Sequence, residues 1–333
     1  MASEWRIDEL QTVATCPACG AAPGEYRYQQ LHDYLESVPG EWSLRDCRGC
    51  GSLFLDPRPT PQAIGKAYAS YYTHRSGATT YEDDNGHSLL WRLANGYMNA
   101  RYGPQRLPAI AAGRFMIPLI PALRQQLDFF YRGLPRVKGR LLDVGCGNGV
   151  FLLRARAAGW NVAGVEPDPL AVATARLDGL DVFEGTLDSF CDAQRFDVIT
   201  SSHVIEHVHE PRALLKRMFD LLRTDGTIWL ATPNVQSMGH RWFGRAWRGL
   251  EPPRHLVVFS AQALRGLLTK VGFTDIRFHR RGRGAAYILR ASRELARRKR
   301  SDARGLPPGV VDLMASLSAT AGEELVITAR KPC

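Results

Sequence analysis

The chain has 333 residues, of which 45% are hydrophobic and 23% charged, a composition that excludes wholesale disorder and predicts one full domain with a smaller module. Its formal net charge of +10 favours a partner such as nucleic acid, an anionic membrane surface or an acidic substrate. The sequence contains neither an apolar signal segment near Met1 nor an apolar run of about 20 residues, so we expect a cytoplasmic protein without a membrane span.

The N-terminal segment, residues 1–75, carries two near-identical Cys-x-x-Cys-Gly motifs. Each motif curls the backbone so that both sulfurs can face one ion, and four thiolates suit tetrahedral zinc. Residues 20–46 separate the pairs by more than the usual ribbon spacing, so a hairpin or helix must be inserted there. A redox dithiol would need one pair in a thioredoxin-like setting, and we therefore predict a zinc-ribbon-like module with structural Zn²⁺. The predicted ligands are Cys16, Cys19, Cys47 and Cys50.

Residues 76–136 are predicted to link this module to the next domain. Thr60 and Pro61 suit the N-cap and first position of a short helix over 61–75. A polar, flexible stretch is expected at 76–86, and residues 87–133 are predicted to be mostly helical, with interruptions at four prolines.

Beyond Pro135 short apolar strands alternate with helices, which predicts a doubly wound, mostly parallel seven-stranded α/β sheet. The predicted strands are 140–144, 161–165, 180–183, 196–200, 227–231, 273–279 and 325–329. The predicted helices are 150–158, 168–178, 211–222 and 260–271. We assign 137–333 to this domain, with a lid at 233–258 and a partly helical insertion at 282–321. The basic stretch 290–304 in the insertion is expected to be a solvated helix face.

A glycine-rich turn joins the first predicted strand to the helix that follows it. Glycines let the backbone turn sharply and approach a ligand closely, and the helix N-terminus offers free N–H groups. Val150 stands where the dinucleotide fingerprint needs Gly or Ala, which disfavours NAD. Asp143 can bind an ammonium group directly or through water, and Glu166, at the end of the second strand, can accept hydrogen bonds from both ribose hydroxyls. The turn comprises Asp143, Gly145, Cys146, Gly147 and Gly149.

This combination resembles the class I S-adenosylmethionine (SAM)-dependent methyltransferases, over about residues 137–281 and the last strand. The resemblance implies a Rossmann-like fold with SAM as cofactor, and adenine bound along 184–187. Thr186 replaces the Asp of many members, so adenine contacts are expected from backbone groups and Leu187. The implied cofactor residues are Asp143, Gly145, Cys146, Gly147, Gly149, Glu166, Thr186, Leu187 and His203.

Three titratable residues, His203, Glu206 and His207, follow the fourth strand, at the edge of the sheet that lines a ligand crevice. An acceptor hydroxyl must lose its proton during methyl transfer, and a neutral histidine can take it near pH 7. The segment resembles the Glu-x-x-Glu-His of ubiquinone-type O-methyltransferases, which is thought to bind a divalent ion. His203 replaces the first Glu, and hard cations prefer oxygen ligands. We therefore predict His207, and next His203, as acid–base residues without a metal; the alternative is that they only pack the crossover.

A long loop rich in aromatic, Arg and His residues is predicted after the fifth strand, and such loops are usually functional. Its string at 247–256, Trp-Arg-Gly-Leu-Glu-Pro-Pro-Arg-His-Leu, resembles methyltransferases of bacterial glycan and natural-product pathways. That resemblance implies substrate contacts by Trp247, Arg254 and His255, and His255 is a further acid–base candidate. The alternative is a loop packed on the sheet edge with Arg254 exposed.

We predict a SAM-dependent methyltransferase that acts on a small-molecule or glycan acceptor, at a hydroxyl. An RNA methyltransferase using the zinc module and the basic segment is one alternative. The fourth strand lacks an Asn-Pro-Pro-Tyr type motif and no base-stacking platform is evident, which disfavours nucleic acid. A non-catalytic zinc-ribbon adaptor is the other alternative, disfavoured by the intact glycines and Glu166. The acceptor, O- against C-methylation, the participation of a divalent ion, contact with a membrane surface and the oligomeric state are left open.

Overall fold

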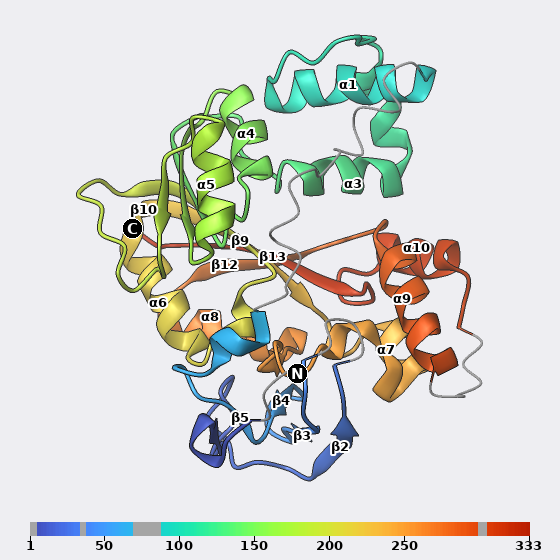
Figure 1. The fold of residues 1–333 in the computed structure, drawn as a ribbon. Helices are drawn as coiled ribbons and strands as arrows, with labels where there is room; N and C mark the ends of the chain where they lie inside the picture. Colours follow the sequence, from blue (N-terminus) through green and yellow to red (C-terminus); the bar gives the residue numbers. More distant parts are fainter. Residues whose placement is uncertain (1–4, 34–37, 69–87, 299–304) are drawn as a thin grey trace.

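The computed structural model describes residues 5–33, 38–68, 88–298 and 305–333 (Figure 1). The polar stretch predicted at 76–86 lies outside these residues, as do much of the helix predicted at 61–75 and the end of the basic stretch. The described part of that helix is one 3-10 segment, η2 (Ile64–Tyr68). No described helix is long and apolar enough to cross a bilayer.

A seven-stranded sheet forms the centre of the molecule (Figure 1), with the order β12-β13-β10-β9-β6-β7-β8. Its strands are β6 (Arg140–Val144), β7 (Asn161–Glu166), β8 (Val182–Glu184), β9 (Phe196–Ser202), β10 (Leu222–Pro233), β12 (Thr274–His279) and β13 (Glu324–Arg330). Only β13 runs antiparallel to its neighbours in this sheet, so the prediction of a mostly parallel seven-stranded sheet is confirmed. The strand order reverses between β6 and β9, and ligand crevices form at such a reversal.

Helices cover both faces of this sheet. The helices of one face are α4 (Val150–Ala157) and α5 (Pro169–Leu177), and residues of α1 (Leu89–Tyr102) and α3 (Pro121–Phe130) belong to the same apolar cluster. Those of the other face are α6 (Pro211–Leu221) and α8 (Ala261–Val271). The predicted cap of α8 is confirmed, because the Ser260 hydroxyl accepts a hydrogen bond from the Ala263 N–H at 3.0 Å. Between α1 and α3 lie the short α2 (Gly113–Met116) and η4 (Ile117–Leu119).

The N-terminal module builds a second sheet, of order β11-β4-β3-β2. Its strands are β2 (Tyr26–Leu31), β3 (Trp42–Asp46), β4 (Leu53–Leu55) and β11 (Val257–Val258). β2 and β3 are the hairpin inserted between the two cysteine pairs, whereas β11 comes from the segment predicted as a lid. In the same module η1 (Ile7–Glu9) precedes β1 (Leu10–Gln11), which pairs with β5 (Arg58–Pro59). The module and the α/β domain therefore share one sheet.

The prediction of a long irregular loop after β10 is wrong. The segment folds into α7 (Met238–Phe243), η6 (Gly244–Ala246), η7 (Arg248–Leu250) and β11. Trp247, Leu250 and Leu256 are buried between the N-terminal sheet and the helical insertion, so burial of apolar side chains orders the chain. The insertion is partly helical as predicted, with α9 (Ala285–Arg298) and α10 (Pro308–Leu317). The domain boundaries at 75 and 136 stay predictions.

Candidate active site and metal centre

The glycine turn after β6 keeps an open cradle at its centre. Gly145 and Gly149 have φ of +71° and +82°, and a Cβ at either would overlap the side chain of Val204 or Leu180. A Cβ at Gly147, whose φ is +54°, would meet no atom of the described residues within 4 Å. Packing thus requires the outer two glycines, while Gly147 faces space that a ligand can occupy.

Glu166 holds the glycine turn from the end of β7. Its carboxylate accepts hydrogen bonds from the Gly147 N–H at 2.8 Å and from the Asp168 N–H at 3.0 Å. Burial raises the pKa of this carboxyl group above its ordinary value. A carboxylate has about four acceptor positions, so two remain for the hydroxyls of a ribose.

Asp143 lies fully buried beneath the same turn, beside a residue that the sequence analysis missed. Its Oδ1 accepts hydrogen bonds from the Arg132 guanidinium and from the Thr200 hydroxyl, the latter at 2.9 Å. Arg132 is stacked 3.8 Å from the Phe151 ring centroid. Asp143 Oδ2 has no hydrogen-bond partner among the described residues, so one buried acceptor stays open to a ligand. No sequence motif marks Arg132, which follows α3.

The remaining predicted cofactor residues flank this turn. Cys146 is buried, and its N–H donates to the Val165 carbonyl at 3.2 Å. Leu187, beyond β8, is buried in the core, whereas Thr186 is exposed. Their contacts to SAM stay predictions.

A cavity of about 210 Å³ lies at the carboxyl ends of β9 and β10. It brings together four of the predicted site residues, His203, His207, Trp247 and His255. Arg254, predicted to bind substrate, does not line it, and the neighbouring Arg248 does. The sequence analysis missed several of the residues that line the cavity. These are Arg248, Glu251, Tyr287, Ile288, Glu323 and Glu324.

His203 is held between two carboxylates at the cavity wall. Its Nδ1 lies 3.2 Å from Glu206 and its Nε2 2.9 Å from Glu324, on a backbone with φ of +56°. Burial opposes the charge, but Glu206 and Glu324 outweigh it and raise the pKa of His203 to about 10. His203 is therefore an imidazolium near neutral pH, with both ring nitrogens engaged.

His207 and His255 pack ring against ring, with centroids 4.7 Å apart. His207 Nδ1 lies 3.1 Å from the Arg254 carbonyl and 2.9 Å from the Tyr68 hydroxyl of the N-terminal module. Because a carbonyl only accepts, the contact with Arg254 requires a proton on Nδ1. His255 Nδ1 likewise lies 2.8 Å from the Gly249 carbonyl, and burial lowers the pKa of His255 to about 4.

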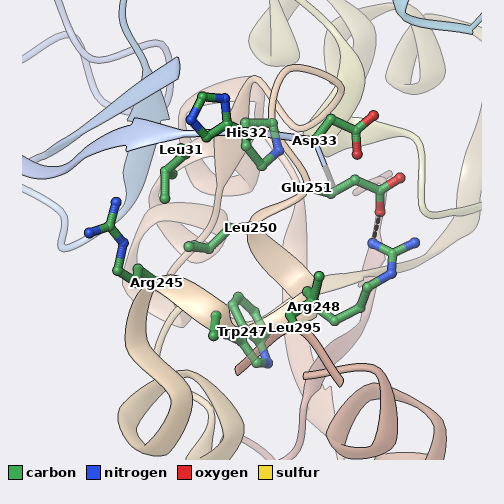
Figure 2. A pocket seen from close by; sticks show the side chains of 11 residues that line it. Leu31, His32, Asp33, Arg245, Trp247, Arg248, Leu250, Glu251 and Leu295 are labelled. Carbon is green, nitrogen blue, oxygen red and sulfur yellow. Dashed lines mark hydrogen bonds and ion pairs between the residues drawn. The ribbon is translucent and has the colours of Figure 1, made fainter. Parts of the chain in front are cut away.

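A cluster of buried charges ties the N-terminal module to the lid. Arg254 is fully buried and donates to Asp33 at 2.7 Å and to Glu251 at 2.9 Å. Glu251 also pairs with Arg248 (Figure 2). A small cavity of about 30 Å³ lies next to this pair and is lined by residues of the N-terminal module, the lid and α9. Arg254 thus joins the two parts of the chain, and the expected alternative of an exposed Arg254 is wrong.

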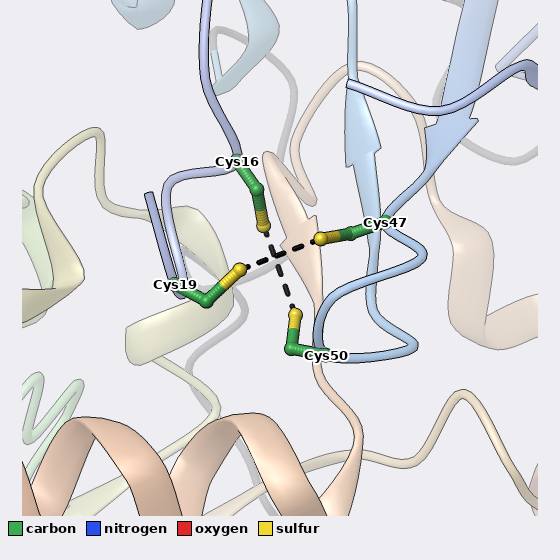
Figure 3. Close-up of side chains that lie close together, drawn as sticks. All are labelled: Cys16, Cys19, Cys47 and Cys50. Atoms are coloured by element: carbon green, nitrogen blue, oxygen red, sulfur yellow. Dashed lines mark hydrogen bonds between the residues drawn. The ribbon is translucent and has the colours of Figure 1, made fainter. Parts of the chain in front are cut away.

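The four cysteines of the two motifs meet at one point (Figure 3). The sulfurs of Cys16 and Cys50 lie 3.8 Å apart, and those of Cys19 and Cys47 lie 3.4 Å apart. Tetrahedral zinc with bonds of about 2.3 Å would space its sulfurs by about 3.8 Å. The two turns match, since the Gly20 and Gly51 N–H groups donate to the Cys16 and Cys47 carbonyls at 2.8 and 2.7 Å. This donor set and spacing fit a zinc ion.

A second group could also hold a metal ion. Glu206, His207 and His255 place one ligand atom each within 4.8 Å of one another. Glu206 is fully buried and accepts a hydrogen bond from the Thr232 hydroxyl at 2.9 Å.

Comparison with known proteins finds relatives of the segment that carries the glycine turn. The profile of a methyltransferase domain family matches residues 114–277. A ubiquinone biosynthesis O-methyltransferase of Actinobacillus pleuropneumoniae is 36% identical over 131 residues, covering 35% of this chain and 55% of the relative. One from Xanthomonas oryzae is 30% identical over 150 residues, covering 43% and 58%. The chain thus spans little more than half the length of these relatives.

A solved structure of a SAM-dependent methyltransferase, possible histamine N-methyltransferase, from Thermotoga maritima is also similar. It is 18% identical, with a TM-score of 0.42, and the match covers 73% of this chain and 99% of that one.

Proposed function

Since residues 114–277 match a methyltransferase domain family, we propose that the protein transfers the methyl group of SAM to a hydroxyl of a small-molecule or glycan acceptor. The curated relatives named above are O-methyltransferases, which supports a hydroxyl as the acceptor group. SAM would be held by the glycine turn, with its ribose on Glu166 and its ammonium group near Asp143 Oδ2.

One observation supports His207 as the general base: the surroundings of the three cavity histidines differ. His203 is charged and engaged at both nitrogens. His255 has a pKa of about 4, which makes it a weak base. His207 has its Nδ1 proton held by the Arg254 carbonyl, which leaves Nε2 as an acceptor.

The mechanism assigns one task to each of these groups. SAM, when bound, supplies a methyl group activated by the positive sulfonium and leaves as S-adenosylhomocysteine. The acceptor oxygen forms the new bond to the methyl carbon as the carbon–sulfur bond breaks, and His207 Nε2 takes the hydroxyl proton. The cavity walls, including Trp247 and His255, align the acceptor with the methyl group. No divalent ion takes part in this proposal.

The volume of the cavity limits how much of the acceptor can be enclosed. Its volume of about 210 Å³ is smaller than the roughly 300–1,000 Å³ of sites that enclose a whole small molecule. The wall includes Tyr287, whose residue surface is 62% exposed. An acceptor that inserts only its reacting end, such as a terminal sugar, fits this shape.

The four-cysteine cluster is proposed to bind one structural zinc ion. Four protein ligands close the coordination sphere, and Cys16, Cys47 and Cys50 are buried against the core of the α/β domain. The Cys50 carbonyl accepts a hydrogen bond from the Ser260 hydroxyl, which caps α8. Zinc would therefore hold the module against β11 and α8. β11 begins two residues after His255 in the sequence.

Screening with labelled SAM against nucleotide sugars, lipid-linked glycans and RNA tests the acceptor class. With the acceptor found, His207→Ala should lower turnover by about 10²–10⁴-fold and leave SAM affinity unchanged. His279→Ala, an exposed histidine on β12, is the matched control and should retain activity. Activity should also survive EDTA dialysis.

Two results would contradict the proposed base. Full activity of both His203→Ala and His207→Ala would assign the chemistry to positioning or to His255, which His255→Ala then tests. Loss of activity in EDTA that Mg²⁺ or Zn²⁺ restores, with the cysteine zinc still present, would assign Glu206, His207 and His255 to a metal.

A further inference from the structure

Apolar side chains are exposed where the chain turns from α2 into α3. Phe115, Met116, Leu119 and Ile120 are 66%, 49%, 81% and 46% exposed. Leu107, earlier in the same connection, is 86% exposed. Isolated exposed apolar residues are ordinary, but four within six consecutive positions form a patch that calls for a partner.

A second exposed apolar face lies on α10, beside α3 (Figure 1). Leu313 and Leu317 are 59% and 68% exposed, and Val310 and Met314 are exposed as well. The Gln125 side-chain amide of α3 donates to the Ser316 carbonyl of α10 at 3.2 Å. We call residues 115–120 together with the exposed face of α10 the apolar surface.

The charge around the apolar surface is positive. Residues 88–130 contain five arginines and one acidic residue, Asp128, which pairs with Arg124 at 4.0 Å. Arg114 is exposed, with its guanidinium 4.5 Å from the Phe115 ring centroid, and the Arg124 side chain is 43% exposed. Asp312, on α10, accepts a hydrogen bond from the Ala285 N–H of α9 at 3.1 Å, and the five arginines outnumber Asp128 and Asp312.

We propose that the apolar surface docks the protein on an anionic lipid bilayer. Leucine, phenylalanine and methionine side chains would enter the boundary between headgroups and acyl chains, while the arginines would bind anionic headgroups. A second copy of this chain would set the same arginines against each other, which disfavours self-association through this face. α9 packs against α10 and carries Tyr287 of the cavity wall, so docking brings the cavity close to the membrane.

Sedimentation with lipid vesicles tests the proposal without knowledge of the acceptor. The full chain should bind vesicles of phosphatidylcholine with roughly 30% phosphatidylglycerol more tightly than pure phosphatidylcholine vesicles, and added salt should weaken binding. The double variant Phe115→Asp/Leu119→Asp should bind at least about tenfold more weakly.

The matched control is Ile7→Asp/Leu177→Asp, which changes the net charge equally at two residues that are 94% and 88% exposed on other elements. It should bind far better than the first double variant. Arg114→Gln should weaken binding about fivefold, the effect of one basic residue at an anionic surface. Circular dichroism and SAM affinity, measured on each variant, confirm that it is folded.

Three results would overturn the proposal. Binding to the anionic vesicles no stronger than to the neutral ones would exclude docking on anionic lipid. Equal weakening in the two double variants would show a response to net charge alone. A dimer in light scattering that Phe115→Asp/Leu119→Asp dissociates would show that a second copy covers the apolar surface.

Discussion

Asp33 should stabilise the protein far more than its place at the end of a short hairpin strand indicates. Its carboxylate binds Arg254 at 2.7 Å, and the two side chains are 2% and 0% exposed. The cluster around them is balanced among the described residues, because the cations Arg248 and Arg254 face the anions Asp33 and Glu251. His255 adds no charge near pH 7, since its pKa is about 4.

The variant Asp33→Asn keeps the shape of the side chain and leaves this cluster with one excess positive charge. Removing one partner of a buried ion pair costs about 3–5 kcal/mol. Glu251 still contacts Arg254, so we expect the lower end of that range, a loss of about 3 kcal/mol in the free energy of unfolding. Asp220→Asn is the control, because its pair with Lys216 is exposed and should contribute less than about 1 kcal/mol.

Urea unfolding followed by tryptophan fluorescence measures both losses. The double variant Asp33→Asn/Arg254→Met removes one charge of each sign, so it should be more stable than the sum of the single changes predicts, by at least about 1.5 kcal/mol. A loss for Asp33→Asn no larger than for Asp220→Asn, or strict additivity in the double variant, would refute a charge-balanced junction between the module and the lid.

Three further predictions concern the cofactor, the zinc and the charged histidine. Glu166→Ala should weaken SAM binding by about 1.5–3 kcal/mol, and unchanged affinity in calorimetry would refute the ribose contact. Protein purified without added metal should contain one zinc per chain, and less than about 0.3 zinc with the module's four thiols freely titratable would contradict the site. His203 should remain an imidazolium at pH 8 in an NMR titration, and a ring that titrates below pH 7 would contradict its pairing with Glu206 and Glu324. The pKa of His203 is raised from about 6.5 to about 10. The contribution of the charged His203 to the free energy of unfolding should therefore be complete below pH 6.5 and disappear as the pH rises through 10.

The local sequence was enough to predict the α/β domain. Strand and helix periods, the Ser260 cap and the glycine turn are properties of neighbouring residues, so they were visible without the structure. The four-cysteine cluster was also predictable from the local sequence, because two matching Cys-x-x-Cys-Gly turns predict four sulfurs around one point.

The geometry of the site could not be predicted in the same way, because it depends on contacts between residues that are distant in the sequence. The segment after β10 was expected to be irregular because its aromatic and basic residues show no period, yet burial against the N-terminal sheet and α9 orders it. Arg254 was expected at the substrate, but Asp33, 221 residues away in the sequence, binds its guanidinium.

The sequence by itself determined the fold class, the glycine turn, the cysteine cluster and the set of candidate histidines. Only the tertiary structure separated those histidines from one another. His203 meets Glu324 from the last strand, and His207 meets Tyr68 from the N-terminal module. The protonation of an imidazole depends on the charges and carbonyls that surround it in space, and these come from segments that the order of the residues does not bring together.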